Sequence, residues 1–125
     1  MSFLQIPLGI ENPDSSFLWQ HPSIVELPAG STSRFDFCSL GTPWRKRTKV
    51  LCWGCDPPPS LMCRGRQLCK FSGEPHIVLA GRVGKTLRTK LAESYPEKLC
   101  SMIVRNFELA RADMQLARAW SAIRP

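Results

Sequence analysis

Sulfur and imidazole side chains in the middle of the chain have the types and the spacing of a metal site. Cys52 and Cys55 form a Cys-x-x-Cys pair, and Cys63, Cys69 and His76 follow within reach of it. Thiolates and imidazoles are the groups with which proteins hold zinc in tetrahedral structural sites. Such an ion would let a segment with little hydrophobic core keep its shape. If zinc is bound, we expect Cys55, Cys63, Cys69 and His76 to be its ligands.

The same cysteines have a second interpretation. The two pairs are close in sequence, and Cys63 and Cys69 do not form a second Cys-x-x-Cys. Free and partly buried thiols are therefore the alternative to metal ligands. Cys38 or Cys52 could substitute for one of the expected ligands, but Trp53 beside Cys52 fits a strand with alternating side chains, which favours packing for Cys52.

A second group of residues combines a carboxylate with arginines. Glu11 stands in a Gly-Ile-Glu-Asn-Pro sequence, and Arg45 and Arg47 stand in a basic segment that follows a Gly-Thr-Pro sequence. Chemistry at C5 of cytosine needs a thiolate nucleophile, a carboxyl group at N3, donors at O2 and a flipped-out base.

In this order the two motifs resemble the second half of the catalytic domain of cytosine-5 DNA methyltransferases, over residues 8 to 100. In that family the carboxyl group belongs to a Glu-Asn-Val or Glu-Asn-Pro sequence after a strand, and the arginines belong to a later Gly-x-Pro segment. The chain is most similar to a phage-like or mobile-element-like branch. The positions that carry this similarity are Cys38, Gly41, Pro43, Arg45, Lys46, Thr48, Cys63, Cys69, His76, Tyr95, Pro96, Leu99 and Cys100.

The resemblance implies roles for these residues. Glu11 would contact the target base, and Arg45 and Arg47 would contact the base or its phosphate. The Gly-rich loop that binds S-adenosylmethionine and the Pro-Cys loop that carries the nucleophile have no counterpart before Glu11. We therefore expect the isolated chain not to methylate DNA. Catalysis would need a separate or upstream methyltransferase half, and S-adenosylmethionine would bind only in that complete enzyme.

The charge of the chain favours DNA as a partner. The formal net charge is +7, and basic residues cluster around residues 45–49, 64–70 and 82–90. Clusters of this kind bind phosphate backbones. The candidate DNA-binding residues are Arg45, Lys46, Arg47, Lys49, Arg64 and Arg66.

Other classes of function fit the same residues. A small zinc-stabilised basic module could bind nucleic acid without chemistry, with Trp44, Trp53 and Phe71 stacking on bases. A decayed mobile-element product with no selected role is a third interpretation. A phosphate-binding loop is not expected at residues 81–86, because two residues separate the glycines there and such a loop needs four.

The predicted elements form an α/β arrangement. Apolar or alternating segments predict strands over residues 2–10, 35–38, 49–53 and 76–80. A helix over residues 17–27 is expected to follow a cap at residues 14–16 and to be split by Pro22. A long amphipathic helix is expected from Pro96 to Trp120. With the resemblance, this predicts a partial Rossmann-like sheet fragment, a loop-rich Cys-containing middle segment and a long C-terminal helix.

We expect one compact unit with three segments. Residues 1–54 would form a methyltransferase-like α/β segment, residues 55–90 a basic Cys/His-containing segment rich in loops, and residues 91–125 the amphipathic helix. No stretch approaches the roughly 20 apolar residues that a membrane span needs, and the N-terminus lacks the basic leader of a secretory signal. We therefore expect no membrane partner and an intracellular location, nuclear or cytoplasmic.

Overall fold

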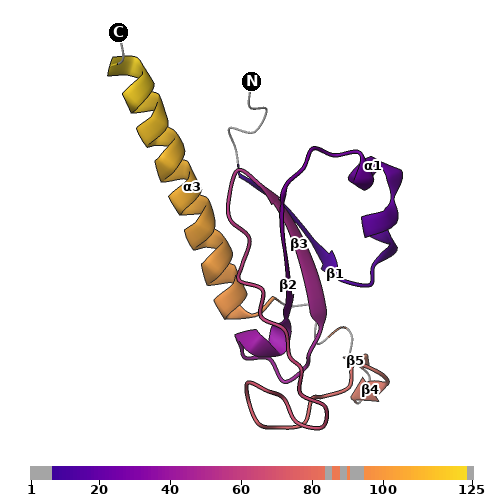
Figure 1. Ribbon diagram of the computed structural model, residues 1–125. Coiled ribbons are helices and arrows are strands. Elements are labelled where there is room, and N and C mark those ends of the chain that lie inside the picture. Colours follow the sequence, from indigo (N-terminus) through magenta and orange to yellow (C-terminus); the bar gives the residue numbers. More distant parts are fainter. Residues whose placement is uncertain (1–6, 84–85, 88–89, 91–94, 124–125) are drawn as a thin grey trace.

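The computed structural model describes residues 7–83, 86–87, 90 and 95–123. In these residues the main sheet has three strands, β1 (Leu8–Pro13), β2 (Ser31–Asp36) and β3 (Arg47–Trp53). Their order is β1-β3-β2, and β3 is antiparallel to both neighbours. The outer strands β1 and β2 therefore run in the same direction (Figure 1).

The predicted strands of this sheet are confirmed with shifted ends. The first strand is found from residue 8 onward, and the first part of its predicted range lies outside the described residues. The strand predicted over residues 35–38 ends early, because residues 37–40 form the 3-10 helix η2 (Phe37–Leu40). Each neighbouring pair in the sheet is antiparallel. The mixed α/β class is therefore confirmed, but the Rossmann-like character is not.

The connection from β1 to β2 contains the helical segment that Pro22 was expected to split. It consists of the 3-10 helix η1 (Phe17–Gln20) and the short helix α1 (Pro22–Val25). The Ser16 hydroxyl caps η1 by accepting a hydrogen bond from the Leu18 N–H at 3.2 Å. Proline fits the first turn of α1, where its missing N–H would have no helical partner. The predicted split is confirmed.

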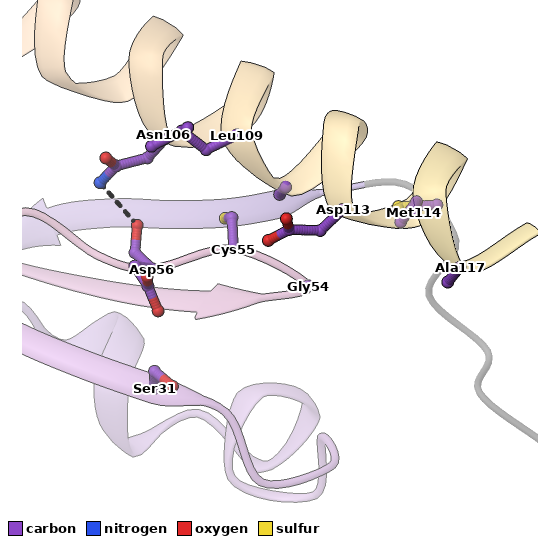
Figure 2. A pocket seen from close by; sticks show the side chains of 10 residues that line it. Ser31, Gly54, Cys55, Asp56, Asn106, Leu109, Asp113, Met114 and Ala117 are labelled. Carbon is purple, nitrogen blue, oxygen red and sulfur yellow. Dashed lines mark hydrogen bonds between the residues drawn. The ribbon is translucent and has the colours of Figure 1, made fainter. Parts of the chain in front are cut away.

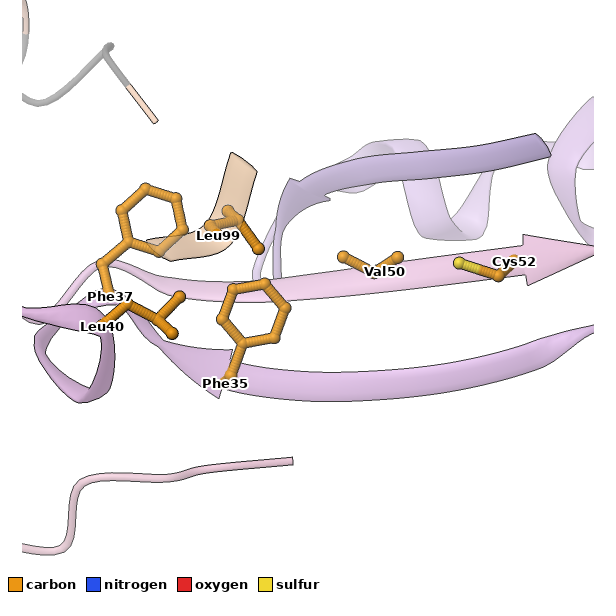
Figure 3. Close-up of a cluster of buried hydrophobic side chains, with 6 residues drawn as sticks. All are labelled: Phe35, Phe37, Leu40, Val50, Cys52 and Leu99. Atoms are coloured by element: carbon orange, nitrogen blue, oxygen red, sulfur yellow. The ribbon is translucent and has the colours of Figure 1, made fainter. Parts of the chain in front are cut away.

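A long helix, α3 (Glu97–Ile123), lies along the side of the sheet opposite α1 (Figure 1). Its predicted range of residues 96–120 is close to the observed one. Leu99 is only 1% exposed and joins a core of side chains from β2, η2 and β3. Met102 and Ile103 extend this contact along the helix. Figure 3 shows the six core residues, which are Phe35, Phe37, Leu40, Val50, Cys52 and Leu99.

The strand register explains which residues face this core. Val50 lies opposite Ser33 on one side and Glu11 on the other. Residues directly opposite each other in antiparallel strands project from the same face. Because Val50 packs in the core below α3, Glu11 also projects from the face that α3 covers.

The strand predicted over residues 76–80 is wrong. These residues form no strand, and the Ile77 N–H donates instead to the Pro43 carbonyl at 2.9 Å. The Nε2 atom of His76 lies 3.7 Å from the Sγ atom of Cys63. Further along, β4 (Arg82–Val83) pairs with β5 (Thr86–Leu87). Within the described part of the chain, no helix combines the length and the apolar character that crossing a membrane requires.

Candidate metal centre and nucleic-acid interface

Three thiols and one imidazole come together from the segments that follow β2 and β3. The Sγ atoms of Cys38, Cys63 and Cys69 and a ring nitrogen of His76 all lie within 4.8 Å of one another. The three cysteines are buried, with 3%, 0% and 4% of their surface exposed. A zinc ion with bonds of about 2.3 Å to sulfur separates its tetrahedral ligands by about 3.8 Å. The Cys63 Sγ to His76 Nε2 distance of 3.7 Å already has this value, so the cluster could hold a metal such as zinc.

The backbone around the cluster donates hydrogen bonds to its sulfur atoms. The Lys70 N–H donates to Cys63 Sγ, and the Phe71 N–H donates to Cys69 Sγ, each at 3.4 Å. The Cys69 N–H in turn donates to the Glu74 carbonyl at 2.7 Å, which closes a tight loop. Donors of this kind stabilise thiolate ligands and orient them towards an ion.

The pKa values of two thiols differ strongly within this cluster. Burial opposes ionisation of Cys69, but hydrogen bonds from the Ser72 hydroxyl, the Ser72 N–H and the Phe71 N–H lower its pKa to about 6. For Cys38, burial and the neighbouring thiols of Cys69 and Cys63 raise the pKa to about 12. A bound cation would favour the thiolate form of each ligand. The cluster therefore has one thiol ready to ionise and one that requires the positive charge of an ion.

The cluster contains three of the four preferred ligands, and its fourth member is Cys38, one of the two residues given as substitutes, instead of Cys55. Cys38 takes the place that the sequence analysis gave to Cys55. Cys38 follows β2, and Asp36 at the end of β2 pairs with Arg47 at the start of β3. Cys55 follows the other end of β3, after Gly54, whose φ of 70° turns the chain. The length of β3 thus separates Cys55 from the cluster.

Cys55 instead lies between the end of β3 and helix α3. It packs against the core that contains Cys52, and burial, together with the nearby Cys55 thiol and Asp56, raises the pKa of Cys52 to about 12. Figure 2 shows Cys55 in an open cavity of about 490 Å³, where the Asn106 side chain donates to the Asp56 carbonyl at 2.9 Å. Burial also raises the pKa of the Cys55 thiol, and among the described residues neither Cys52 nor Cys55 belongs to the group of ligand atoms around His76.

A buried carboxylate connects the metal cluster with the predicted arginines. Asp36 is fully buried, and Arg47 binds it with two hydrogen bonds of 3.0 and 3.1 Å. The Nε atom of Arg45 lies 3.8 Å from the same carboxylate. The Cys63 N–H donates to Asp36 at 2.5 Å, and both arginines donate to the Cys63 carbonyl. Sequence reasoning missed Asp36, because only its register opposite Arg47 reveals its role.

The remaining predicted DNA-binding residues lie in two environments. Lys46 lies over the Phe37 ring at 5.0 Å and has a positive φ of 33°, whereas Lys49 lies over the Trp19 ring at 4.7 Å. Both ammonium groups thus contact aromatic faces, which attract cations. The loop of the metal ligands carries exposed basic side chains, which are Arg64, Arg66 and Lys70.

Only one of the three aromatic residues considered for base stacking is exposed. Trp53 is 7% exposed, and its indole N–H donates to the Pro28 carbonyl at 2.8 Å. Trp44 packs against the core. Phe71 is 40% exposed and lies between the two metal ligands Cys69 and His76 in sequence. Stacking by Trp53 is therefore excluded in this fold, because its ring is needed inside.

Glu11 has a partner that lies far away in sequence. The hydroxyl of Tyr95 donates a hydrogen bond to Glu11 Oε2 at 2.6 Å. This bond to the carboxylate, together with burial, raises the pKa of Tyr95 to about 12. Tyr95 lies just before α3 and is 52% exposed, so this hydrogen bond lies at the surface near the start of the helix. Tyr95 appeared in the sequence only as part of the family resemblance, without an expected role.

The two motifs of the resemblance meet at one end of the sheet. Since β1 and β2 run in the same direction, their carboxyl ends lie at the same edge. Pro13 at the end of β1 pairs with Thr48, and the next residue, Asp14, donates its N–H to the Arg47 carbonyl at 3.1 Å. This end also holds the loops that carry the metal cluster (Figure 1).

Comparison of the chain with protein-family models, curated protein sequences and solved structures found no match. The fold and the site geometry therefore stand beside the resemblance of the two motifs as the grounds for assigning a function. The structure alone shows that the three cysteines meet His76 and that Tyr95 bonds to Glu11.

Replacing Cys38 should remove the metal, whereas replacing Cys55 should not. Protein purified without added metal is expected to contain about one zinc per chain, since four protein ligands close a structural site. Cys38→Ser should weaken zinc binding at least about tenfold in competition with a chromogenic chelator, as loss of even supporting groups has that effect. Cys55→Ser is the matched control and should bind zinc like the unchanged protein. Equal zinc binding by both variants would contradict this assignment of ligands.

Tyr95 is the single tyrosine of the chain, so the ultraviolet absorbance of tyrosinate reports this residue alone. Its titration midpoint should lie near 12, and in Glu11→Gln it should fall towards the ordinary value of 10.0, because the negative charge beside the hydroxyl is gone. The far-ultraviolet circular dichroism signal of α3, followed in parallel, shows whether the fold persists at each pH. A midpoint near 10 in the folded, unchanged protein would exclude the hydrogen bond.

Proposed function

We propose that the chain is the rear part of a cytosine-5 DNA methyltransferase-like protein, which contacts DNA and does not methylate it alone. The observation that carries this proposal is the meeting of the Glu-Asn-Pro and arginine motifs at one end of the sheet, where the Asp14 N–H bonds the Arg47 carbonyl. The motifs are more than 30 residues apart in sequence. The contact joins backbone atoms of the two motifs, while the Glu11 side chain projects from the face that α3 covers and the Arg47 side chain projects from the opposite face.

The arrangement of the sheet supports this proposal. Strands β1 and β2 are parallel to each other and are joined by a helical crossover, and helices lie on both sides of the sheet (Figure 1). Helices on both faces of a sheet are typical of α/β proteins, whereas the neighbouring strands of this sheet are antiparallel. The three strands would then be one edge of a larger Rossmann-like sheet, with the other half supplied by a separate or upstream segment.

In this proposal each group has a defined role. Glu11 would accept hydrogen bonds from the target cytosine, and Tyr95 would hold the carboxylate until the base replaces its hydroxyl. Arg45, Arg47 and the exposed basic residues of the metal-ligand loop would contact DNA phosphates or the base. S-adenosylmethionine and the cysteine nucleophile would come from the other half, so that turnover needs both.

The metal would be structural zinc. Four protein ligands, Cys38, Cys63, Cys69 and His76, leave no open position for water or substrate, which is the pattern of structural rather than catalytic sites. The ion would close the loop of residues 63–76, which has no strand or helix of its own.

The second candidate function is a zinc-stabilised module that binds nucleic acid without chemistry. It is favoured by the presence of Arg64, Arg66 and Lys70 on the same loop as three of the metal ligands. The two candidates share the metal and the phosphate contacts. They differ in whether Glu11 recognises a base.

The basic residues of the metal-ligand loop should contact phosphates. The double variant Arg64→Ala/Arg66→Ala should lower the slope of log affinity against log salt by about 1.8, since each phosphate contact contributes about 0.9. The matched control is Arg105→Ala/Arg111→Ala on exposed positions of α3, which removes the same charge away from this end of the sheet. Fluorescence anisotropy with a mixed-sequence DNA duplex measures both. Equal losses in the two variants would contradict a local interface, and no binding by the unchanged protein would exclude both candidate functions.

Glu11 should recognise an extrahelical cytosine. The protein is expected to bind a duplex with one unpaired cytosine about tenfold more tightly than the same duplex with an unpaired thymine, because a carboxylate accepts from the cytosine N4 amino group. An unpaired base costs the least energy to flip out. Glu11→Gln should abolish this preference and leave binding to the fully paired duplex unchanged. Binding without preference in the unchanged protein would favour the module without chemistry.

A further inference from the structure

We propose that a metal ion in the Cys38, Cys63, Cys69 and His76 cluster holds Arg45 and Arg47 in the arrangement that contacts DNA, so that metal binding and DNA binding strengthen each other. This inference rests on the proposed DNA contact of the two arginines. It adds a coupling between two sites that the ligand set and the charge pattern do not imply by themselves.

The backbone of the candidate ligand Cys63 would transmit this coupling. The N–H of Cys63 donates to Asp36 at 2.5 Å, and the carbonyl of Cys63 accepts hydrogen bonds from Arg45 and Arg47. Arg45 also reaches the Gly65 carbonyl at 3.5 Å. The guanidinium groups thus rest on the same residue whose thiol would bind the metal, and a shift of that residue must move them.

Two other hydrogen bonds join the metal-ligand loop to the arginine segment. The Ile77 N–H, next to the ligand His76, donates to the Pro43 carbonyl at 2.9 Å, and the Asp36 N–H donates to the Leu61 carbonyl at 2.9 Å. The fourth ligand, Cys38, lies in η2, immediately before the Gly-Thr-Pro sequence. Metal ligands therefore bracket the arginine segment on both sides.

In the part of the chain that the structure describes, the loop is held by hydrogen bonds and by few buried apolar contacts. Among the described residues, Cys63 and Cys69 pack with Cys38 in a small cluster of their own, separate from the main core below α3. Most other side chains of residues 61–75 are exposed. Segments with few buried apolar contacts open locally at low free-energy cost. Coordination would add the missing constraint.

The charged groups around Asp36 leave part of each arginine available to bind a phosphate. One buried carboxylate, that of Asp36, faces two guanidinium groups, and the Nε atom of Arg45 is buried without a hydrogen-bond partner. The side chains of Arg45 and Arg47 are 40% and 39% exposed. Each arginine can therefore keep its contact with Asp36 or Cys63 while its exposed part contacts an anion such as a DNA phosphate.

A coupling of this kind is reciprocal. If metal raises the affinity for DNA by a given factor, DNA must raise the affinity for metal by the same factor. Couplings between sites in proteins commonly lie between about 5-fold and 150-fold. Agreement between the two factors shows that both measurements report the same equilibrium, and the variants below test whether Arg45 carries the coupling.

The test compares zinc-loaded protein with chelator-treated protein. Binding to a mixed-sequence DNA duplex should be about tenfold weaker without zinc, and zinc affinity should be about tenfold higher with the duplex present. In Arg45→Ala, the effect of zinc on DNA affinity and the effect of DNA on zinc affinity should both decrease by the same factor. Arg64→Ala is the matched control, because this exposed residue should lose DNA affinity equally in both metal states and preserve both factors.

Hydrogen exchange shows whether the effect is local. The amides of Cys63 and Ile77 should exchange faster without zinc, whereas those of β2 and β3 stay protected. Loss of protection throughout the sheet would overturn the inference, because unfolding rather than a coupling would then explain weaker binding. Equal DNA affinity with and without zinc would also overturn it and leave the proposed function intact. No DNA binding in either state would remove the proposed function itself.

Discussion

The fold at the end of the sheet depends on the buried carboxylate of Asp36. A carboxylate without exposure to water is unfavourable unless charges and hydrogen bonds compensate its lost hydration. Arg47 supplies a two-pronged ion pair, Arg45 adds a second cation, and the Cys63 N–H adds a short hydrogen bond. These contacts join the end of β2, the start of β3 and the metal-ligand loop. Removal of one partner costs about 3–5 kcal/mol in a fully buried pair, and less here because the two arginine side chains are 40% and 39% exposed.

The apolar core and the candidate metal cluster would stabilise different parts of the chain. The apolar core lies between the sheet and the first turns of α3, where Leu99 closes over Phe35 and Val50. The loop of residues 63–76 contributes nothing to this core among the described residues, and its buried side chains are thiols. Apolar burial therefore stabilises the sheet and helix, whereas coordination would stabilise the loop. A chain of this size gains from such a division, because a small domain buries a limited apolar area.

Strand direction decides where the chemistry-bearing residues lie. The shared direction of β1 and β2 places Pro13, Arg47 and the metal-ligand loop at one end of the sheet, with Glu11 opposite the middle of β3 and Cys55 beyond the other end. The pairing of Pro13 with Thr48 sets the register that brings the two motifs together. A slip of one residue would turn Glu11 to the opposite face, away from Tyr95 and α3. The site thus depends on register as much as on residue type.

The sequence by itself determined the elements that follow from local spacing and backbone chemistry. Pro22 had to split the first helix because it lacks an N–H, and the apolar repeat around Leu99 had to form one side of a helix. The ligands Cys63, Cys69 and His76 could be recognised because they lie on one loop. Only the tertiary structure decided that Cys38 completes the cluster, that Asp36 receives both arginines and that Tyr95 bonds to Glu11. These contacts join residues up to 84 positions apart, and they depend on strand register and helix docking, which no local pattern encodes.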